Sequence, residues 1–190
     1  SLALASRLAY ANRGAVESTT RGQWGLKSCV FIDADDTQCF VASSHTAVLV
    51  AFRGTERVLA DWLADLNVFS TDRAYGTVHR GFRSAFGVVD TQLRTELTRF
   101  PGQPVLLTGH SLGGALAMIA AAEWRGVFDV KSVYTYGQPA VGRANFVGFM
   151  NQHYTGKLLR VVNNDDIVAR VPPTYSHVGR LIRFDAGGHA

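Results

Sequence analysis

A serine held between glycines is the part of this chain whose residue types could do chemistry. Residues 109–114 read Gly-His-Ser-Leu-Gly-Gly, with an apolar run before them at 104–107 and an alanine-rich run after them at 115–122. A strand, G-x-S-x-G and a helix form the context of a nucleophile elbow, a turn so tight that the flanking residues need almost no side chain. The pattern predicts that Ser111 is a nucleophile; the alternative is a glycine-rich turn with an incidental serine.

A nucleophilic serine needs partners, because its hydroxyl is weakly nucleophilic near neutral pH. A histidine must accept its proton, and a carboxylate must orient that histidine. The backbone N–H of Leu112, at the start of the expected helix, would face negative charge on a substrate oxygen. Two acids, Asp165 and Asp166, follow a later apolar run. Local sequence does not separate them, and one of them is equally suited to capping a loop. This chemistry requires no metal or cofactor.

The elements that must position these residues follow from hydrophobic periodicity. Helices are predicted at 2–12, 81–100, 112–125 and 143–153, and strands at 24–32, 39–43, 47–52, 104–108, 130–136, 158–163 and 178–184. Strands that alternate with helices imply an α/β fold, with a mostly parallel central sheet and helices on both faces. Active sites of such sheets lie at the carboxyl ends of the strands, which is where the pattern places Ser111.

Composition narrows the class of protein. The chain has 190 residues, 47% hydrophobic content and a net charge of +4, which suits one domain over residues 1–190. It has no apolar run long enough for a membrane-spanning helix. Its basic residues are scattered, without the clustering among aromatic residues that indicates nucleic-acid binding. Cys29 and Cys39 flank a turn-like cluster at 33–36, so they either bridge a hairpin as a disulfide or are both reduced. Without a nearby histidine they do not indicate a zinc site.

Five segments, in this order along the chain, resemble the class 3 lipases, the fungal-type triacylglycerol lipases with bacterial and plant phospholipase relatives. The family has the α/β-hydrolase fold, and the resemblance covers nearly the whole chain. The segments are 51–55 with 61–66, 78–82, 108–114, 136–142 and 164–179.

The resemblance implies roles for several residues. The family's catalytic aspartate directly precedes Ile-Val, which favours Asp166 over Asp165. The segment after Arg53 and Gly54 supplies an oxyanion donor, which falls on Thr55 and joins the N–H of Leu112. Residues 57–66 correspond to the family's lid, and they carry an apolar stripe at helical spacing. A buried core helix would show the same stripe. The stripe consists of Val58, Leu59, Trp62, Leu63 and Leu66.

The histidine of the triad has more than one candidate. His79 precedes the serine, out of order, and His110 within the elbow is structural in the family. The resemblance places the catalytic histidine on a loop beyond the last strand, which makes His189 the candidate within this sequence. His177 is one alternative. The other is a histidine beyond Ala190, which would mean that the domain continues past residue 190.

These inferences together predict a triacylglycerol lipase that cleaves lipid esters at an oil–water or membrane interface through an acyl-enzyme. We expect a secreted monomer without a cofactor; a cytoplasmic location is the alternative. The competing activities are those of a phospholipase A1 and a short-chain or feruloyl-like esterase. A catalytically inactive hydrolase fold that binds lipid or protein is the alternative from another class.

Overall fold

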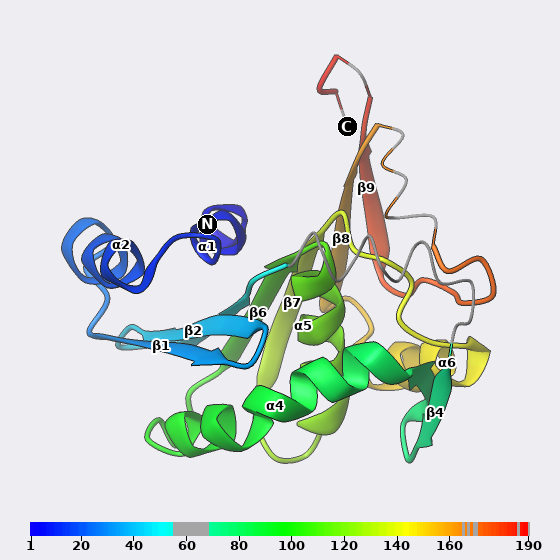
Figure 1. Cartoon of the computed structure of the whole chain (residues 1–190), viewed down its shortest axis with the longest axis horizontal. Coiled ribbons are helices and arrows are strands. Elements are labelled where there is room, and N and C mark those ends of the chain that lie inside the picture. Colours follow the sequence, from blue (N-terminus) through cyan, green and yellow to red (C-terminus); the bar gives the residue numbers. More distant parts are fainter. Residues whose placement is uncertain (55–68, 165, 167, 169–170, 186, 190) are drawn as a thin grey trace.

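The structure is a computed structural model of the chain, and it describes all residues except 55–68, 165, 167, 169–170, 186 and 190 (Figure 1). Among the described residues, a seven-stranded sheet has the order β1-β2-β3-β6-β7-β8-β9. The strands are β1 (Ser28–Ala34), β2 (Thr37–Ser43), β3 (Val48–Phe52), β6 (Val105–His110), β7 (Val130–Tyr136), β8 (Leu158–Asn163) and β9 (Arg180–Phe184). β1, β2 and β3 pair antiparallel, and every pairing from β3 to β9 is parallel. The predicted mostly parallel sheet is confirmed.

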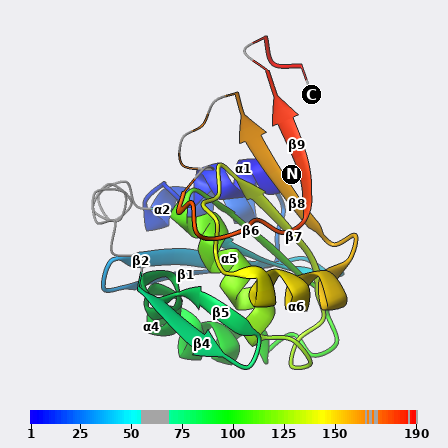
Figure 2. The same cartoon turned by 90° about the vertical axis from the view of Figure 1, so that its right-hand side faces the viewer.

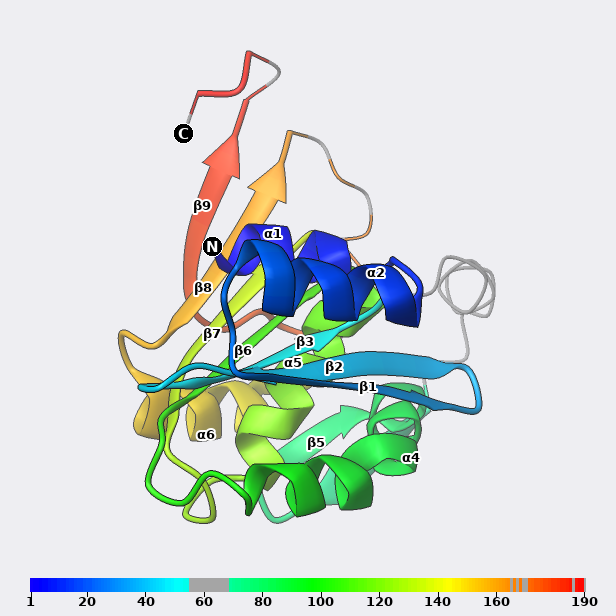
Figure 3. The same cartoon turned by 90° about the vertical axis from the view of Figure 1, so that its left-hand side faces the viewer.

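Helices cover both faces of this sheet, as predicted (Figures 1 and 3). One face carries the three crossover helices, α4 (Arg80–Leu97), α5 (Leu112–Glu123) and α6 (Ala144–Tyr154). The other carries α1 (Leu2–Leu8) and α2 (Arg13–Ser18), which continues into the short π-helix η1 (Thr19–Gln23). A separate hairpin of β4 (Ser70–Arg73) and β5 (Gly76–His79) packs beside α6 (Figure 2).

The two faces have separate hydrophobic cores. The larger core joins α4, α5 and α6 to the sheet, and the smaller one joins α1 and α2 to β1, β2 and β3. In α4 the apolar residues recur at helical spacing, at Phe82, Phe86, Val89, Leu93 and Leu97, and all five are buried. α5 is buried on all sides over residues 112–122, because it lies between the sheet and α4, and its alanines permit close packing.

The first helix is shorter than predicted. α1 ends at Leu8, and Asn12 starts a new helix by accepting a hydrogen bond from the N–H of Ala15 at 2.9 Å. An asparagine at a helix N-cap is favourable, because it satisfies a backbone donor that has no partner within the helix. The β4–β5 hairpin was not predicted either, because its short strands are mostly polar and lack a clear alternation of apolar residues.

The two cysteines lie on opposite faces of the β1–β2 hairpin. Cys29 pairs with Ala42, and Cys39 pairs with Ile32, so the two positions are three register steps apart. Because side chains alternate between the faces of a strand, an odd offset places one thiol in each core. Both thiols are free and buried, and burial raises the pKa of each. The disulfide alternative is therefore wrong.

Within the part of the chain that the structure describes, the helices are too short or too polar to cross a membrane.

Candidate active site

Ser111 occupies the turn between β6 and α5 with backbone angles that a serine rarely adopts. Its φ is 55° and its ψ is −128°. A residue held in such a region costs about 1–3 kcal/mol of stability, and such residues concentrate at active sites. The N–H of Ser111 donates to the carbonyl oxygen of Tyr136 at 2.8 Å, which fixes the turn to the end of β7. The motif at 109–114 thus forms the strained strand-to-helix turn that the sequence predicts.

The glycines around Ser111 are required by contacts between backbones. A Cβ on Gly109 would lie 2.7 Å from the Gly114 nitrogen and closer still to the Gly113 carbonyl. A Cβ on Gly113 would lie 2.8 Å from the carbonyl carbon of Phe52. Real Cβ atoms do not approach backbone this closely, so only glycine permits β6, α5 and the end of β3 to meet here.

Two backbone segments meet at the serine. Leu112 is the first residue of α5, and the N–H groups of a helix's first turn have no partner within the helix. The N–H of Leu112 is therefore available to a substrate oxygen, whereas the N–H of Gly114 donates to the Ser111 carbonyl at 3.0 Å. On the other side, Gly54 follows β3, and a Cβ on it would lie 2.6 Å from the His110 carbonyl oxygen and 3.2 Å from Ser111 Cβ. The chain thus leaves β3 in contact with the elbow.

The predicted oxyanion donor Thr55 comes next after Gly54, and it lies outside the described residues. The predicted lid, residues 57–66, lies outside them too. Its apolar stripe consists of Val58, Leu59, Trp62, Leu63 and Leu66.

Asp166 follows β8, which lies two strands from β6 in the sheet order, and it is on the same edge of the sheet as Ser111. Its N–H donates to the Asn163 carbonyl at 3.1 Å, and its Oδ1 accepts from the N–H of Val168 at 3.0 Å. Its other oxygen, Oδ2, lies against Gly137, where a Cβ would be only 2.6 Å from it. Gly137 directly follows Tyr136, whose carbonyl holds Ser111. The structure therefore brings Ser111 and Asp166 to the same edge, and Asp165 lies outside the described residues.

His189 lies in a local turn after β9. The carboxylate of Asp185 accepts hydrogen bonds from the N–H groups of Gly187 at 2.8 Å and His189 at 2.9 Å, and it also lies 3.4 Å from His189 Nδ1. The His189 side chain is 83% exposed. This turn projects beyond the end of β9 (Figures 1 and 2), and the acid described beside His189 is Asp185 rather than Asp166.

The other histidines have distinct positions. His177 lines a cleft with Leu158 and Arg180, the first residues of β8 and β9, so it lies near the opposite edge of the sheet from Ser111. His79 caps α4, accepting hydrogen bonds from the N–H groups of Gly81 and Phe82 through Nδ1. His177 therefore lacks the position that a proton acceptor for Ser111 requires, and His79 Nδ1 is engaged as a helix cap.

Tyr10 is a residue of this region that sequence reasoning did not single out. Its hydroxyl and His110 Nδ1 form a hydrogen bond of 2.7 Å, and the guanidinium of Arg53 lies over its ring at 5.6 Å. The hydroxyl also lies against Gly54, where a Cβ would overlap it. The sequence holds no local signal for this role, because Tyr10 and His110 are 100 positions apart.

Comparison with known proteins places the chain among lipases. Residues 49–176 match the family Lipase (class 3). A secreted mono- and diacylglycerol lipase 1 from Fusarium solani is 35% identical over 155 residues, which cover 76% of this chain and 46% of that protein. The chain spans about half the length of the curated relatives it matches.

Solved structures share the fold. Lipase II from Rhizopus niveus is 26% identical with a TM-score of 0.79, covering 97% of this chain and 78% of that one. A triacylglycerol lipase whose catalytic centre is described as a serine protease triad is 26% identical with a TM-score of 0.74, over 96% of this chain and 78% of that one. Since the family match covers more than half of the chain and includes the strained serine turn, the chain belongs to the class 3 lipase family.

Proposed function

We propose that this protein is a serine hydrolase that cleaves carboxylic esters of lipids, as a triacylglycerol lipase does, through an acyl-enzyme. The observation that carries the proposal is the position of Ser111, in a strained turn at the amino end of α5, with the Asp166 carboxylate on the same edge of the sheet. Two relatives named as lipases, one secreted and one a triacylglycerol lipase, support lipid esters as the substrate class and secretion as the location.

In this proposal, Ser111 Oγ attacks the ester carbonyl while a histidine accepts its proton. Asp166 stabilises the imidazolium, which then protonates the leaving alcohol, and water releases the acyl group by the reverse sequence. The N–H groups of Leu112 and Thr55 bind the negative oxygen. Loss of one such donor typically removes about 2.7–4 kcal/mol of transition-state stabilisation.

The histidine is His189 in this proposal, with a histidine beyond Ala190 as the alternative. His189 can act only if it exchanges Asp185 for Asp166, because its described acidic partner is Asp185. The variant His189→Gln separates the two. Loss of turnover would assign the base to His189, and full turnover in the protein's complete chain would assign it elsewhere.

Residues 57–66 are the lid of this proposal, and their apolar stripe would face the lipid when the lid opens. A lid of this kind can limit the rate of turnover. We also propose that the protein acts as a monomer at an oil–water or membrane interface.

A fluorophosphonate that reacts with activated serines tests the proposal directly. We expect one covalent adduct by intact mass, which the variant Ser111→Ala lacks, because only a serine paired with a working base reacts rapidly. A trypsin digest should place the adduct on the peptide that contains Ser111. A protein without an adduct, or with an equal adduct in the variant, would favour the catalytically inactive lipid-binding alternative.

A series of substrates separates the competing activities. Emulsified long-chain triacylglycerol, phosphatidylcholine and soluble short-chain or feruloyl esters are compared at equal enzyme concentration. We expect the long-chain lipid esters to be preferred. A preference for the soluble esters would replace the lipase proposal with that of an esterase.

A further inference from the structure

A cleft of about 320 Å³ lies between the α1–α2 turn and the ends of β1, β2 and β3. Its walls carry two arginines, Arg13 at the start of α2 and Arg53 just after β3, together with the rings of Tyr10 and Phe31. Nothing in the proposed reaction uses these arginines. The cleft is therefore a feature that ester hydrolysis at Ser111 does not account for.

Both guanidinium groups are held in place by the protein. Arg13 lies over the ring of Phe31 at 5.2 Å, and its Nη1 donates to the Phe31 carbonyl at 3.2 Å. Arg53 lies over the ring of Tyr10, and its Nη1 donates to Gln38 Oε1. In the part of the chain that the structure describes, the other nitrogens of each guanidinium have no hydrogen-bond partner. Each arginine is thus ordered by one nitrogen and retains donors for a ligand, in the fork that matches phosphate oxygens.

The charge of the cleft favours an anion with a single negative charge. One acid, Asp33, lines the cleft beside the two arginines. Its Oδ2 accepts a hydrogen bond from Gln38 Nε2 at 3.0 Å, so the carboxylate faces an amide rather than either guanidinium. Two positive charges and one negative charge leave a net charge of +1, which suits the single charge of a phosphodiester.

The cleft adjoins the nucleophile through one side chain. Tyr10 lines it, and the Tyr10 hydroxyl lies against Gly54, as does Ser111 Cβ. Gly54, which directly follows Arg53, thus lies between the Tyr10 wall of the cleft and Ser111. In a glycerophospholipid, a few bonds of the glycerol separate the acyl ester from the phosphodiester, whereas a triacylglycerol has no charge to place there.

We propose that this cleft binds the phosphodiester of a glycerophospholipid whose acyl ester lies at Ser111. Arg13 and Arg53 donate to its non-bridging oxygens, and Tyr10 separates the headgroup from the reacting ester. The proposal rests on the proposed function, since it assumes that a lipid ester occupies Ser111. It adds phospholipids to the substrate class and makes Arg13 a residue that determines headgroup preference.

Binding to the Ser111→Ala variant tests the site without requiring turnover. Titration calorimetry compares dihexanoylphosphatidylglycerol with the neutral dihexanoylglycerol, both below their aggregation concentrations. We expect the phospholipid to bind about tenfold more tightly, since a charge-assisted hydrogen bond contributes at least that much. The further substitution Arg13→Gln should remove that preference and leave the affinity for dihexanoylglycerol unchanged.

Two further variants make the result specific. Arg13→Lys retains the charge but not the fork, so an intermediate affinity is expected. Arg99→Gln removes one positive charge from a residue paired with Glu96 at the end of α4, and it should change neither affinity. Thermal unfolding of each variant checks that the fold is retained.

Three outcomes would overturn the inference. These are equal affinities for the two lipids, an unchanged preference in Arg13→Gln, or binding of inorganic phosphate alone as tight as that of the phospholipid, which would indicate a free-anion site. Hydrolysis of the same two lipids by the protein with Ser111 tests the proposed function separately. If hydrolysis fails, the binding result still stands. If the binding preference is absent, hydrolysis can still support the proposed function.

Discussion

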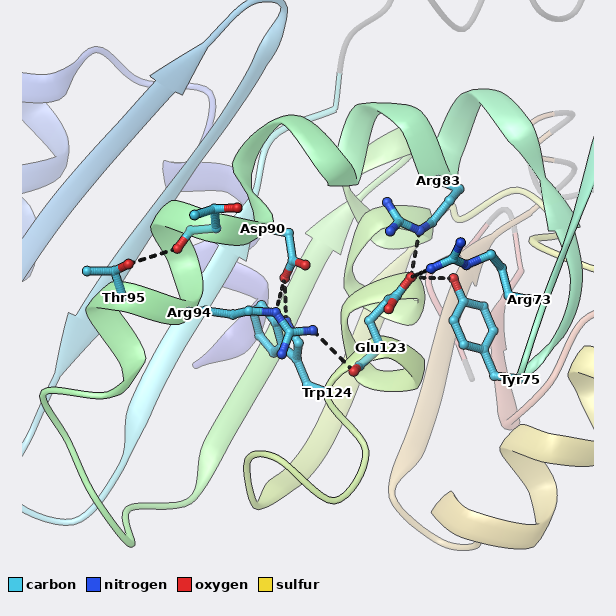
Figure 4. A network of polar contacts seen from close by, with 9 residues as sticks. Arg73, Tyr75, Arg83, Asp90, Arg94, Thr95, Glu123 and Trp124 are labelled. Carbon is cyan, nitrogen blue, oxygen red and sulfur yellow. Dashed lines mark hydrogen bonds and ion pairs between the residues drawn. The ribbon is translucent and has the colours of Figure 1, made fainter.

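The two ends of α5 are held in opposite ways. At its amino end, Ser111 has a positive φ and makes no side-chain capping hydrogen bond, and the turn depends on contacts between glycine backbones. At its carboxyl end, Glu123 and Trp124 lie in a network of charged and aromatic side chains (Figure 4). The same helix thus presents a strained turn to the substrate edge and is anchored by side chains at the far end.

Glu123 is the centre of the far network. Its Oε1 accepts a hydrogen bond from the Tyr75 hydroxyl at 2.9 Å and lies 2.6 Å from Arg83 Nε and 3.4 Å from Arg73 Nη2 (Figure 4). Burial and the neighbouring Glu123 charge raise the pKa of the Tyr75 hydroxyl, which keeps it protonated as a donor. The carboxylate therefore ties α5 to α4 and to the β4–β5 hairpin.

A second set of contacts joins the last turn of α5 to α4. Asp90 Oδ1 accepts hydrogen bonds from Trp124 Nε1 at 2.8 Å and from Arg94 Nε at 2.9 Å. Arg94 Nη2 in turn donates to the Glu123 carbonyl at 3.2 Å. A helix leaves its last carbonyls without partners, so this arginine satisfies one of them. Stability is concentrated at this end, and strain at the other.

Substitution of Ser111 should separate activity from stability most sharply. Ser111→Ala is expected to lower kcat/KM for a lipid ester by about 10⁴–10⁶-fold, because the nucleophile is lost. Ser111→Gly should do the same while raising the free energy of unfolding by about 1 kcal/mol, since glycine adopts a positive φ without strain. Urea unfolding and initial rates measure the two effects. Unchanged hydrolysis by either variant would remove Ser111 from the mechanism.

Substitution of Asp166, whose carboxylate lies beside Gly137, should have the next largest effect on activity. Asp166→Asn should lower kcat by about 10³–10⁴-fold, because an amide cannot stabilise the imidazolium or fix its tautomer. Asp165→Asn is the matched control and should retain most of the activity. A larger loss in Asp165→Asn than in Asp166→Asn would reverse the assignment, and rates measured from pH 6 to 9 with one ester would reveal it.

Packing of the elbow predicts a loss of stability. Gly113→Ala places a methyl group against the Phe52 carbonyl, so the free energy of unfolding should fall by about 3 kcal/mol. Gly148→Ala, within α6, meets no atom within 4 Å and should raise that energy by up to about 1 kcal/mol. Urea unfolding of the two variants compares them directly. A neutral Gly113→Ala would refute the close backbone contact.

At the far end of α5, removal of one charge should weaken the fold without touching catalysis. Glu123→Gln leaves Arg83 and Arg73 without their anion, which should cost about 2 kcal/mol, given that both guanidinium groups are partly exposed. The folded variant should retain the wild-type kcat, in contrast to the variants at the amino end. A fall in kcat with unchanged stability would mean that the two ends are not independent.

Most helices and strands could be predicted from the sequence, because they follow from local residue patterns. The spacing of Phe82, Phe86, Val89 and Leu93 predicted the helix that buries them, and the glycines around Ser111 predicted its turn. The rest depends on contacts between distant segments. The Tyr10–His110 hydrogen bond is of this kind, as is the register that separates the two cysteines. A shift of one residue in register moves a strand residue to the other face of the sheet. The residues next to each cysteine do not specify this register.

The amino ends of α4 and α5 extend the comparison, because α4 is capped by a side chain that titrates. His79 Nδ1 accepts hydrogen bonds from the N–H groups of Gly81 at 3.1 Å and Phe82 at 3.4 Å. Its ring stacks on Phe82 at a centroid distance of 4.3 Å and faces Tyr175 from the side. Burial lowers the pKa of His79, so the ring is neutral at pH 7. Burial raises the pKa of Tyr175, which therefore stays uncharged below pH 7.

Whether the free energy of unfolding rises or falls with pH depends on which state, folded or unfolded, binds the His79 proton at higher pH. Unfolded His79 titrates near pH 6.5, above the pKa of the folded protein, so the unfolded chain gains protons first as the pH falls. The stability from this cap is present above about pH 6.5 and is lost as the pH falls through the folded pKa. Asparagine places a non-titrating acceptor at the same N-cap. Urea unfolding at pH 7.5 and 5.5 should therefore show a smaller loss for His79→Asn than for the wild type. An equal loss in both would mean that the cap does not titrate in this range, and that α4, like α5, begins without a pH-sensitive contact.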